Sequence, residues 1–304
     1  MSASVAEAGR ETATARALEP AAPSRILRRL RRAVGGLVGG GISLAIILVA
    51  VLAPLLAPQN PTEADITARL IPPVWDARGS ASRPLGTDEL GRDSLSRLIY
   101  GSRISLMASA LAVLLSASVG ISLGLAGGFY GGAADLVVTT LVNIMMTFPF
   151  VLLAMAVIAV LGPSFSNMIL VMGITGWPLY ARVVRAQVVK LKAREFIVAS
   201  EALGLPGLGI LLRRVLPNLI NTIVVLATLE VARMIILESF LSFLGLGVQP
   251  PTPSWGGMLG EARAYMFIHW WLAAFPGAAI FVTTLAINLM GDGLRDVMDP
   301  YLRL

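Results

Sequence analysis

Six long apolar runs, separated by shorter polar segments, dominate the hydrophobic pattern of this chain. Each run can cross about 30 Å of hydrocarbon as a helix that rises about 1.5 Å per residue. The fourth run has the weakest pattern, because Gly173, Gly176 and Pro178 interrupt it. We therefore predict an all-α, polytopic membrane bundle of six transmembrane helices, over residues 33–57, 103–128, 134–161, 165–185, 217–245 and 270–291.

Basic residues lie beside these runs in a pattern that orients them. Five arginines precede the first run, within Arg25–Arg32, and the positive-inside rule places this end in the cytoplasm. A second basic excess over 182–214 puts the 186–216 loop on the same side. The predicted organisation is N-in/C-in. It has a disordered, basic-ended tail over 1–32, an extracytoplasmic loop over 58–102, a transmembrane core over 103–291 and a cytoplasmic C-terminus over 292–304.

Composition limits the chemistry that the chain can perform. The formal net charge of +6 would suit nucleic acid, but the basic residues flank apolar runs, so topology explains them and no nucleic-acid partner is expected. The chain has no cysteine, and its single histidine, His269, cannot build a His-rich zinc site or a Ser-His triad. We predict no catalytic residue, no metal and no cofactor.

The sequence contains no phosphate-binding loop that could bind ATP to drive uphill transport. Lys190 and Lys192 are the only lysines, and neither follows the glycine-rich pattern of such a loop. An ion gradient or a partner subunit on the cytoplasmic face could supply the energy.

Residues 193–218, AREFIVASEALGLPGLGILLRRVLPN, form an unusual polar-flanked stretch between two apolar runs. Gly204 fits a left-handed helix cap and Pro206 can open the next helix, so the sequence predicts helix, sharp turn, helix. Phe196, Ala199 and Leu203 share one face of the first helix. Docking to a partner protein is favoured over the alternative of an amphipathic helix lying on the bilayer.

Three charged residues lie within the fifth apolar run, where each costs about 2.5–3.5 kcal/mol on insertion scales. Glu230 and Arg233 are spaced for an i, i+3 pair, while Glu238 points elsewhere. A polar lining or gate of a translocation path and a purely structural pairing are equally compatible with this pattern. Glycines at Gly120, Gly124, Gly127 and Gly128 and within 35–41 indicate close helix packing.

Four stretches together resemble a known family. LGTDELGRDSLSRLIYGSRISL (85–106), ALGLPGLGILLRRVLPN (202–218), ESFLSFLGLGVQPPTPSWGGML (238–259) and NLMGDGLRDVMDPYLR (288–303) are similar to the permease subunits of peptide/nickel ABC importers, of the dipeptide-permease-C-like type. The resemblance implies a type I importer permease fold and a multi-pass protein of a prokaryotic inner membrane. It also implies several partners, namely a second, different permease, two ATP-binding subunits that hydrolyse ATP, an extracytoplasmic binding protein, a peptide substrate and membrane lipid.

The same resemblance assigns residues 195–210 as the coupling helix that contacts the ATPase. The residues so assigned are Glu195, Phe196, Ala199, Ser200, Glu201, Leu203, Gly204 and Pro206. Where the family often has Glu-Ala-Ala, this chain has Val198-Ala199-Ser200, so Glu195 or Glu201 would have to supply an acidic contact.

The expected function is half of the path for dipeptides or oligopeptides. Nickel-chelate or other small-solute import is an alternative within the same class. An ion-coupled secondary transporter would require inverted repeats, of which no convincing second copy is present. A membrane scaffold would not need charges within the fifth run.

Overall fold

The computed structural model describes residues 25–298, which are mainly helical. The long helices are α2 (Arg25–Val51), α4 (Ser94–Tyr130), α5 (Gly132–Thr147), α6 (Phe150–Leu161), α7 (Phe165–Lys192), α10 (Leu216–Phe243) and α12 (Trp271–Met298). The short ones are α3 (Ala53–Leu56), a 3-10 turn (Ile66–Ala68), α8 (Glu195–Ala202), α9 (Gly207–Ile210) and α11 (Trp255–Ala262), and a π-helical segment (Leu211–Val215) joins α9 to α10.

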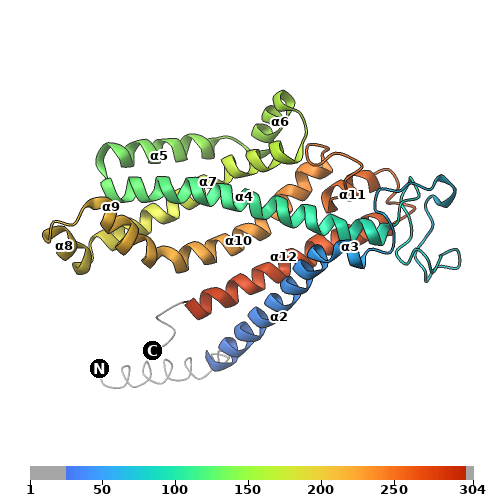
Figure 1. Ribbon diagram of the computed structural model, residues 1–304, viewed down its shortest axis with the longest axis horizontal. Coiled ribbons are helices and arrows are strands. Elements are labelled where there is room, and N and C mark those ends of the chain that lie inside the picture. Colours follow the sequence, from blue (N-terminus) through green and yellow to red (C-terminus); the bar gives the residue numbers. More distant parts are fainter. Residues whose placement is uncertain (1–24, 299–304) are drawn as a thin grey trace, which may run out of the picture.

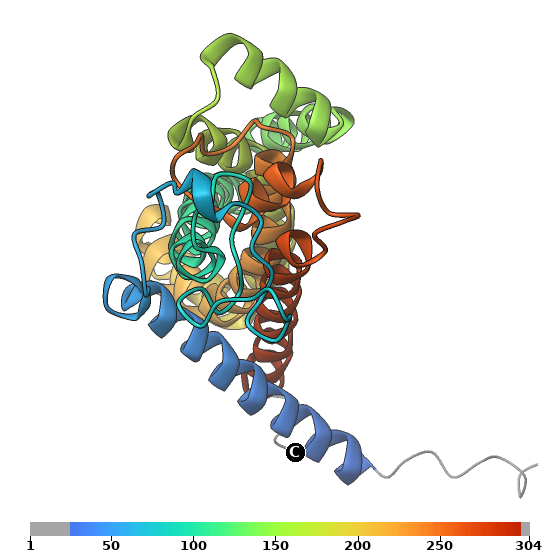
Figure 2. The same ribbon diagram turned by 90° about the vertical axis from the view of Figure 1, so that its right-hand side faces the viewer.

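The helices form three layers along one long axis (Figures 1 and 2). Helices α4, α7 and α10 make the middle layer, α5 and α6 cover one side, and α2 and α12 lie together on the other side. The tip made by α8 and α9 lies at the same end as the start of α2 and the end of α12. The long segment between α3 and α4, together with α11, lies at the opposite end. The α8–α9 tip is therefore separated from α11 and the segment before α4 by the length of the bundle.

Four helical stretches within the described chain are long and apolar enough to cross a membrane, namely Val34–Val51, Ser94–Tyr130, Gly207–Phe243 and Trp271–Met298. Helices α5 and α6 make a fifth if the bent pair counts as one span. Helix α7 has 28 residues but carries basic side chains through its second half, and it does not meet the same apolar criterion.

Three boundaries differ from the sequence prediction. The run over 134–161 is not one straight helix, because α5 and α6 meet at 87° where Pro149 follows Phe148, and the residue before a proline is pushed out of helical geometry. Helix α4 begins at Ser94 rather than at 103, since the Asp93 side chain caps it by accepting from the Ser96 amide at 2.8 Å. Residues 25–32 are helical rather than disordered, while 1–24 and 299–304 lie outside the described residues.

Glycines bring two helix pairs into close contact, as the sequence predicts. A Cβ added at Gly120 on α4 would lie 2.4 Å from the Trp177 carbonyl oxygen of α7, and one at Gly124 would lie 2.7 Å from the Ala181 carbonyl oxygen. On the other side of the bundle, a Cβ at Gly36 of α2 would lie 2.7 Å from the Gly293 Cα of α12. Small residues allow this approach without intervening lipid.

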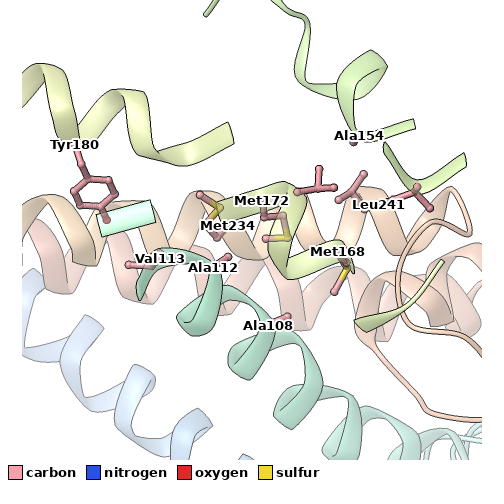
Figure 3. Packing of buried hydrophobic residues seen from close by; sticks show 11 residues of the cluster. Ala108, Ala112, Val113, Ala154, Met168, Met172, Tyr180, Met234 and Leu241 are labelled. Atoms are coloured by element: carbon pink, nitrogen blue, oxygen red, sulfur yellow. The ribbon is translucent and has the colours of Figure 1, made fainter. Parts of the chain in front are cut away.

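The middle layer is packed around small residues of α4 and methionines of α7 and α10 (Figure 3). Ala108 and Ala112 leave room for Met168 and Met172 of α7, and Met234 of α10 completes the contact. Flexible methionine side chains fill such irregular space well. This packing holds α10 against α4 and α7 and so fixes the positions of the charged residues on α10.

Candidate functional site

Glu230 and Arg233 form an ion pair in the middle of α10. The Arg233 Nη1 donates to Glu230 Oε2 at 2.9 Å, as their i, i+3 spacing predicts. The Glu230 side chain is buried, whereas 46% of the Arg233 side chain is exposed. Arg233 therefore holds the buried carboxylate and still presents free N–H groups on the surface of this subunit.

The Tyr180 side chain is a further polar group in this region. It extends from α7 into the core, and its hydroxyl is buried with no hydrogen-bond partner within the described residues (Figure 3). It lies near enough to Glu230 and Arg233 to interact electrostatically with both side chains. The sequence analysis missed Tyr180, because one tyrosine in an apolar helix carries no signal of its own.

Glu238 lies two turns further along α10, about 12 Å from Glu230 at about 1.5 Å per residue. Its side chain is fully buried and does not join the ion pair. The Ser242 hydroxyl donates to Glu238 Oε1 at 2.8 Å, and the Ser239 hydroxyl approaches Oε2 at 3.4 Å. The hydroxyls of Ser105 and Ser254 also face this carboxylate. A group of serines thus replaces the water that a buried carboxylate has lost.

The α8–α9 tip has the helix, turn, helix form that the sequence predicts. Gly204 has φ +73°, and a side chain added there would meet no atom within 4 Å. Ile197 and Ser200 anchor α8 on the bundle, since these two residues of the helix are buried. The remaining candidate residues are solvent-exposed, namely Glu195, Phe196, Ala199, Glu201, Leu203, Gly204 and Pro206.

The α8–α9 tip exposes several large apolar side chains. Leu203 is 81% exposed and Leu208 60% exposed, and Phe196, Val198 and Leu205 lie beside them in the chain and are also exposed. Apolar side chains gathered on such an extension are typical of a surface that another protein covers.

A buried ion-pair network lies at the opposite end of the molecule, where the 58–93 segment meets α4 and α11. Arg97 of α4 pairs with Asp88 at 3.0 Å and with Glu261 of α11 at 2.6 Å, and Arg92 pairs with the same two carboxylates at 2.6 and 3.0 Å. Both guanidinium groups are almost fully buried. The network ties the polar segment to the bundle across more than 160 residues of sequence, as for Arg97 and Glu261.

Glu89 is the fifth member of this network. Its carboxylate lies 3.5 Å from Arg92, and burial raises its pKa above the usual value, helped by the nearby charges of Asp88 and Glu261. The three carboxylates lie close enough together to hold a cation. The two buried arginines already neutralise most of their charge, so the arrangement is an ion-pair network rather than a metal centre.

Comparisons with known proteins agree on one family. The family model described as binding-protein-dependent transport system inner membrane component matches residues 118–304, and the N-terminal TM domain of oligopeptide transport permease C matches residues 24–73. A dipeptide transport system permease protein of Haemophilus influenzae is 43% identical over 244 residues, which is 80% of this chain and 83% of that protein. A di/tripeptide transport system permease protein of Pseudomonas aeruginosa is 45% identical over 80% of each chain.

Two further comparisons extend this result. A glutathione transport system permease protein of Escherichia coli is 44% identical over 72% of each chain. A chain of the inward-facing MetNI methionine ABC transporter superposes with a TM-score of 0.55 at 18% identity, covering 67% of this chain and 96% of that chain, and so shares the fold. The protein is therefore a multi-pass inner-membrane permease that belongs to the binding-protein-dependent transport system inner membrane component family.

Proposed function

We propose that this chain forms half of the translocation path of an ATP-driven importer of dipeptides or other short peptides. Support comes from the relatives, because dipeptide, di/tripeptide and glutathione permeases are 43–45% identical to most of the chain. These names do not favour nickel chelates. The chain itself is non-catalytic and works with a second permease, two ATP-binding subunits and an extracytoplasmic binding protein.

The proposed topology has six spans with both termini in the cytoplasm. It treats α5 and α6 as one bent span and α7 as the fourth, with its basic second half emerging on the cytoplasmic side. The α8–α9 tip is then cytoplasmic, and the Asp88–Glu261 network is extracytoplasmic. Single cysteines at Ser80, Ala199 and Thr252, none of which is buried, test this, because an impermeant reagent added to intact cells should label positions 80 and 252 and leave the Ala199 position unlabelled. Labelling of that position from outside would contradict the topology.

The proposed contact with the ATP-binding subunit is the α8–α9 tip. Its exposed apolar side chains would enter a groove of that subunit as a helix in a groove does. Val198 stands where related permeases often carry an acidic residue, and the exposed Glu195 and Glu201 remain available for a basic partner.

The family match is therefore the main evidence for the proposed function. The exposed α8–α9 tip is the structural feature that best supports the contact with the ATP-binding subunit. Leu203→Asp in an affinity-tagged chain should reduce the recovery of co-purified ATP-binding subunits while leaving the second permease bound. Val297→Asp is a matched control, because Val297 is also exposed but lies in the last turn of α12, and that helix ends at the same end of the bundle. Equal loss of the ATP-binding subunits in both variants, or in neither, would contradict the proposed contact.

The proposed path runs along the polar side chains of α10. Glu238 would lie toward its extracytoplasmic end, and Glu230 with Arg233 would lie near the middle of the membrane. Charged residues at membrane depth normally face protein or water rather than lipid. Arg233, which is half exposed in this subunit, would then face the path or the second permease that closes it.

A further inference from the structure

A polar cleft of about 300 Å³ lies at the proposed extracytoplasmic end, between the end of α10, the 244–254 connection and α11. In Figure 1 this is the place where α10 and α11 approach each other. Ser242 lines the cleft, and its hydroxyl donates a hydrogen bond to the Glu238 carboxylate. The cleft is therefore separated from the buried Glu238 carboxylate, where the proposed path along α10 begins, by the Ser242 side chain.

One wall of the cleft presents a fixed carboxylate oxygen. Glu261 Oε2 accepts from Arg97 at 2.6 Å and from Arg92 at 3.0 Å, whereas Oε1 has no hydrogen bond to any described residue. The ion-pair network holds three carboxylates and two guanidinium groups, which leaves one formal negative charge beside the cleft. Two ion pairs to buried arginines restrain the Glu261 side chain, which lines the cleft, and its Oε1 is available to a cationic group.

The rim of the cleft presents the cationic side chain of Arg263. Arg263 follows α11, and no acidic side chain of residues 34–298 forms an ion pair with it. Its guanidinium lies 5.9 Å from the centre of the Phe243 ring, which is a weak cation–π contact that leaves the N–H groups free. The neighbouring connection is held in shape by Gln249, whose side chain donates to the carbonyls of Gly245 and Gly247 at 3.1 and 3.0 Å.

We propose that this cleft is a receiving subsite for the charged backbone of a short free peptide, in which Glu261 accepts from the α-ammonium group and Arg263 donates to the α-carboxylate. An acid with a free oxygen and a cation with free donors, set in one cleft, complement a zwitterion rather than an anion or a cation alone. The volume lies at the small end of the range for ligand pockets, which suits a dipeptide. The proposal rests on the proposed function, since the peptide substrate comes from that argument.

The test is equilibrium binding of radiolabelled alanyl-alanine to the detergent-purified permease–ATPase complex without the binding protein. Arg263→Gln should weaken binding by about tenfold or more, because a charge-assisted hydrogen bond is lost. Arg263→Lys should restore part of the affinity. Arg103→Gln is the matched control, since Arg103 is likewise exposed and forms no ion pair within residues 34–298, but lies on α4 outside the cleft.

Blocked peptides probe Glu261 without mutating a residue of the buried network. N-acetyl-alanyl-alanine should bind the parental complex at least about tenfold more weakly than the free dipeptide, and alanyl-alanine amide should do the same. The complex that carries Arg263→Gln should bind alanyl-alanine amide and free alanyl-alanine with almost equal affinity. Failure of the parental complex to bind alanyl-alanine, or equal binding of all three peptides, would overturn the subsite. Loss of ATP-driven uptake is a separate result, because it would contradict the proposed function itself.

Discussion

The turn at Gly204 provides a test of the α8–α9 tip that changes backbone conformation without adding a clash. Gly204 has φ +73°, and a side chain built there meets nothing within 4 Å, so a substitution acts through the backbone alone. A β-branched residue at positive φ costs about 2 kcal/mol. That energy lowers the ratio of the native turn to its alternatives about 30-fold. Gly204→Val should therefore tilt the exposed Leu203 and Leu208 away from the ATP-binding subunit.

The assay is ATP hydrolysis stimulated by loaded binding protein, measured together with peptide uptake, in the assembled complex. Gly204→Val should lower both by about tenfold while the chain inserts and assembles at parental levels. Gly204→Asn is the matched control, because asparagine tolerates positive φ and adds a side chain at the same place. Parental activity in the valine variant, or equal loss in both variants, would refute the argument that a left-handed turn positions the tip.

Three further predictions concern packing, the ion pair and the external network. Gly120→Ala should lower the melting temperature of the purified complex by several degrees, because its Cβ would meet the α7 backbone, whereas Gly41→Ala should not, since its surroundings are open. Arg233→Gln should lower the melting temperature because it strands the buried Glu230 carboxylate, and adding Glu230→Gln should restore stability but not uptake if the pair serves the path. The Glu89→Gln variant should have a higher melting temperature than the parental protein at neutral pH. The difference between the two melting temperatures should shrink as the pH falls. The raised pKa of Glu89 means that its carboxylate is most costly to the folded state above that pKa, and protonation at low pH removes the cost.

Local sequence patterns predict the helices and the tip because the relevant forces are local. A chain in hydrocarbon must satisfy its backbone hydrogen bonds within each helix, so long apolar runs specify helices. The Gly204-Leu205-Pro206 sequence likewise specifies a cap followed by a new helix, and the structure has both. The i, i+3 spacing of Glu230 and Arg233 correctly predicts their ion pair.

Features that depend on distant segments could not be predicted in the same way. The 87° break between α5 and α6 has only one proline as a local signal, and a proline can also be absorbed, as Pro178 is within α7. Arg97 and Glu261 are 164 residues apart, so their contact depends on how α4 packs against α11. The serines around Glu238 come from three separate segments, and nothing in the pattern of any one segment indicates the group.

Uptake into proteoliposomes is the most direct measurement of what this protein does. The purified complex containing this chain would be reconstituted with ATP enclosed on the side of the α8–α9 tip, and labelled alanyl-alanine with its binding protein would be supplied on the other side. We expect accumulation of the dipeptide that requires ATP hydrolysis and persists when proton and sodium gradients are abolished. Accumulation that follows an imposed ion gradient without ATP, or no accumulation of any short peptide, would contradict the assignment of this chain as a permease subunit of an ATP-driven peptide importer.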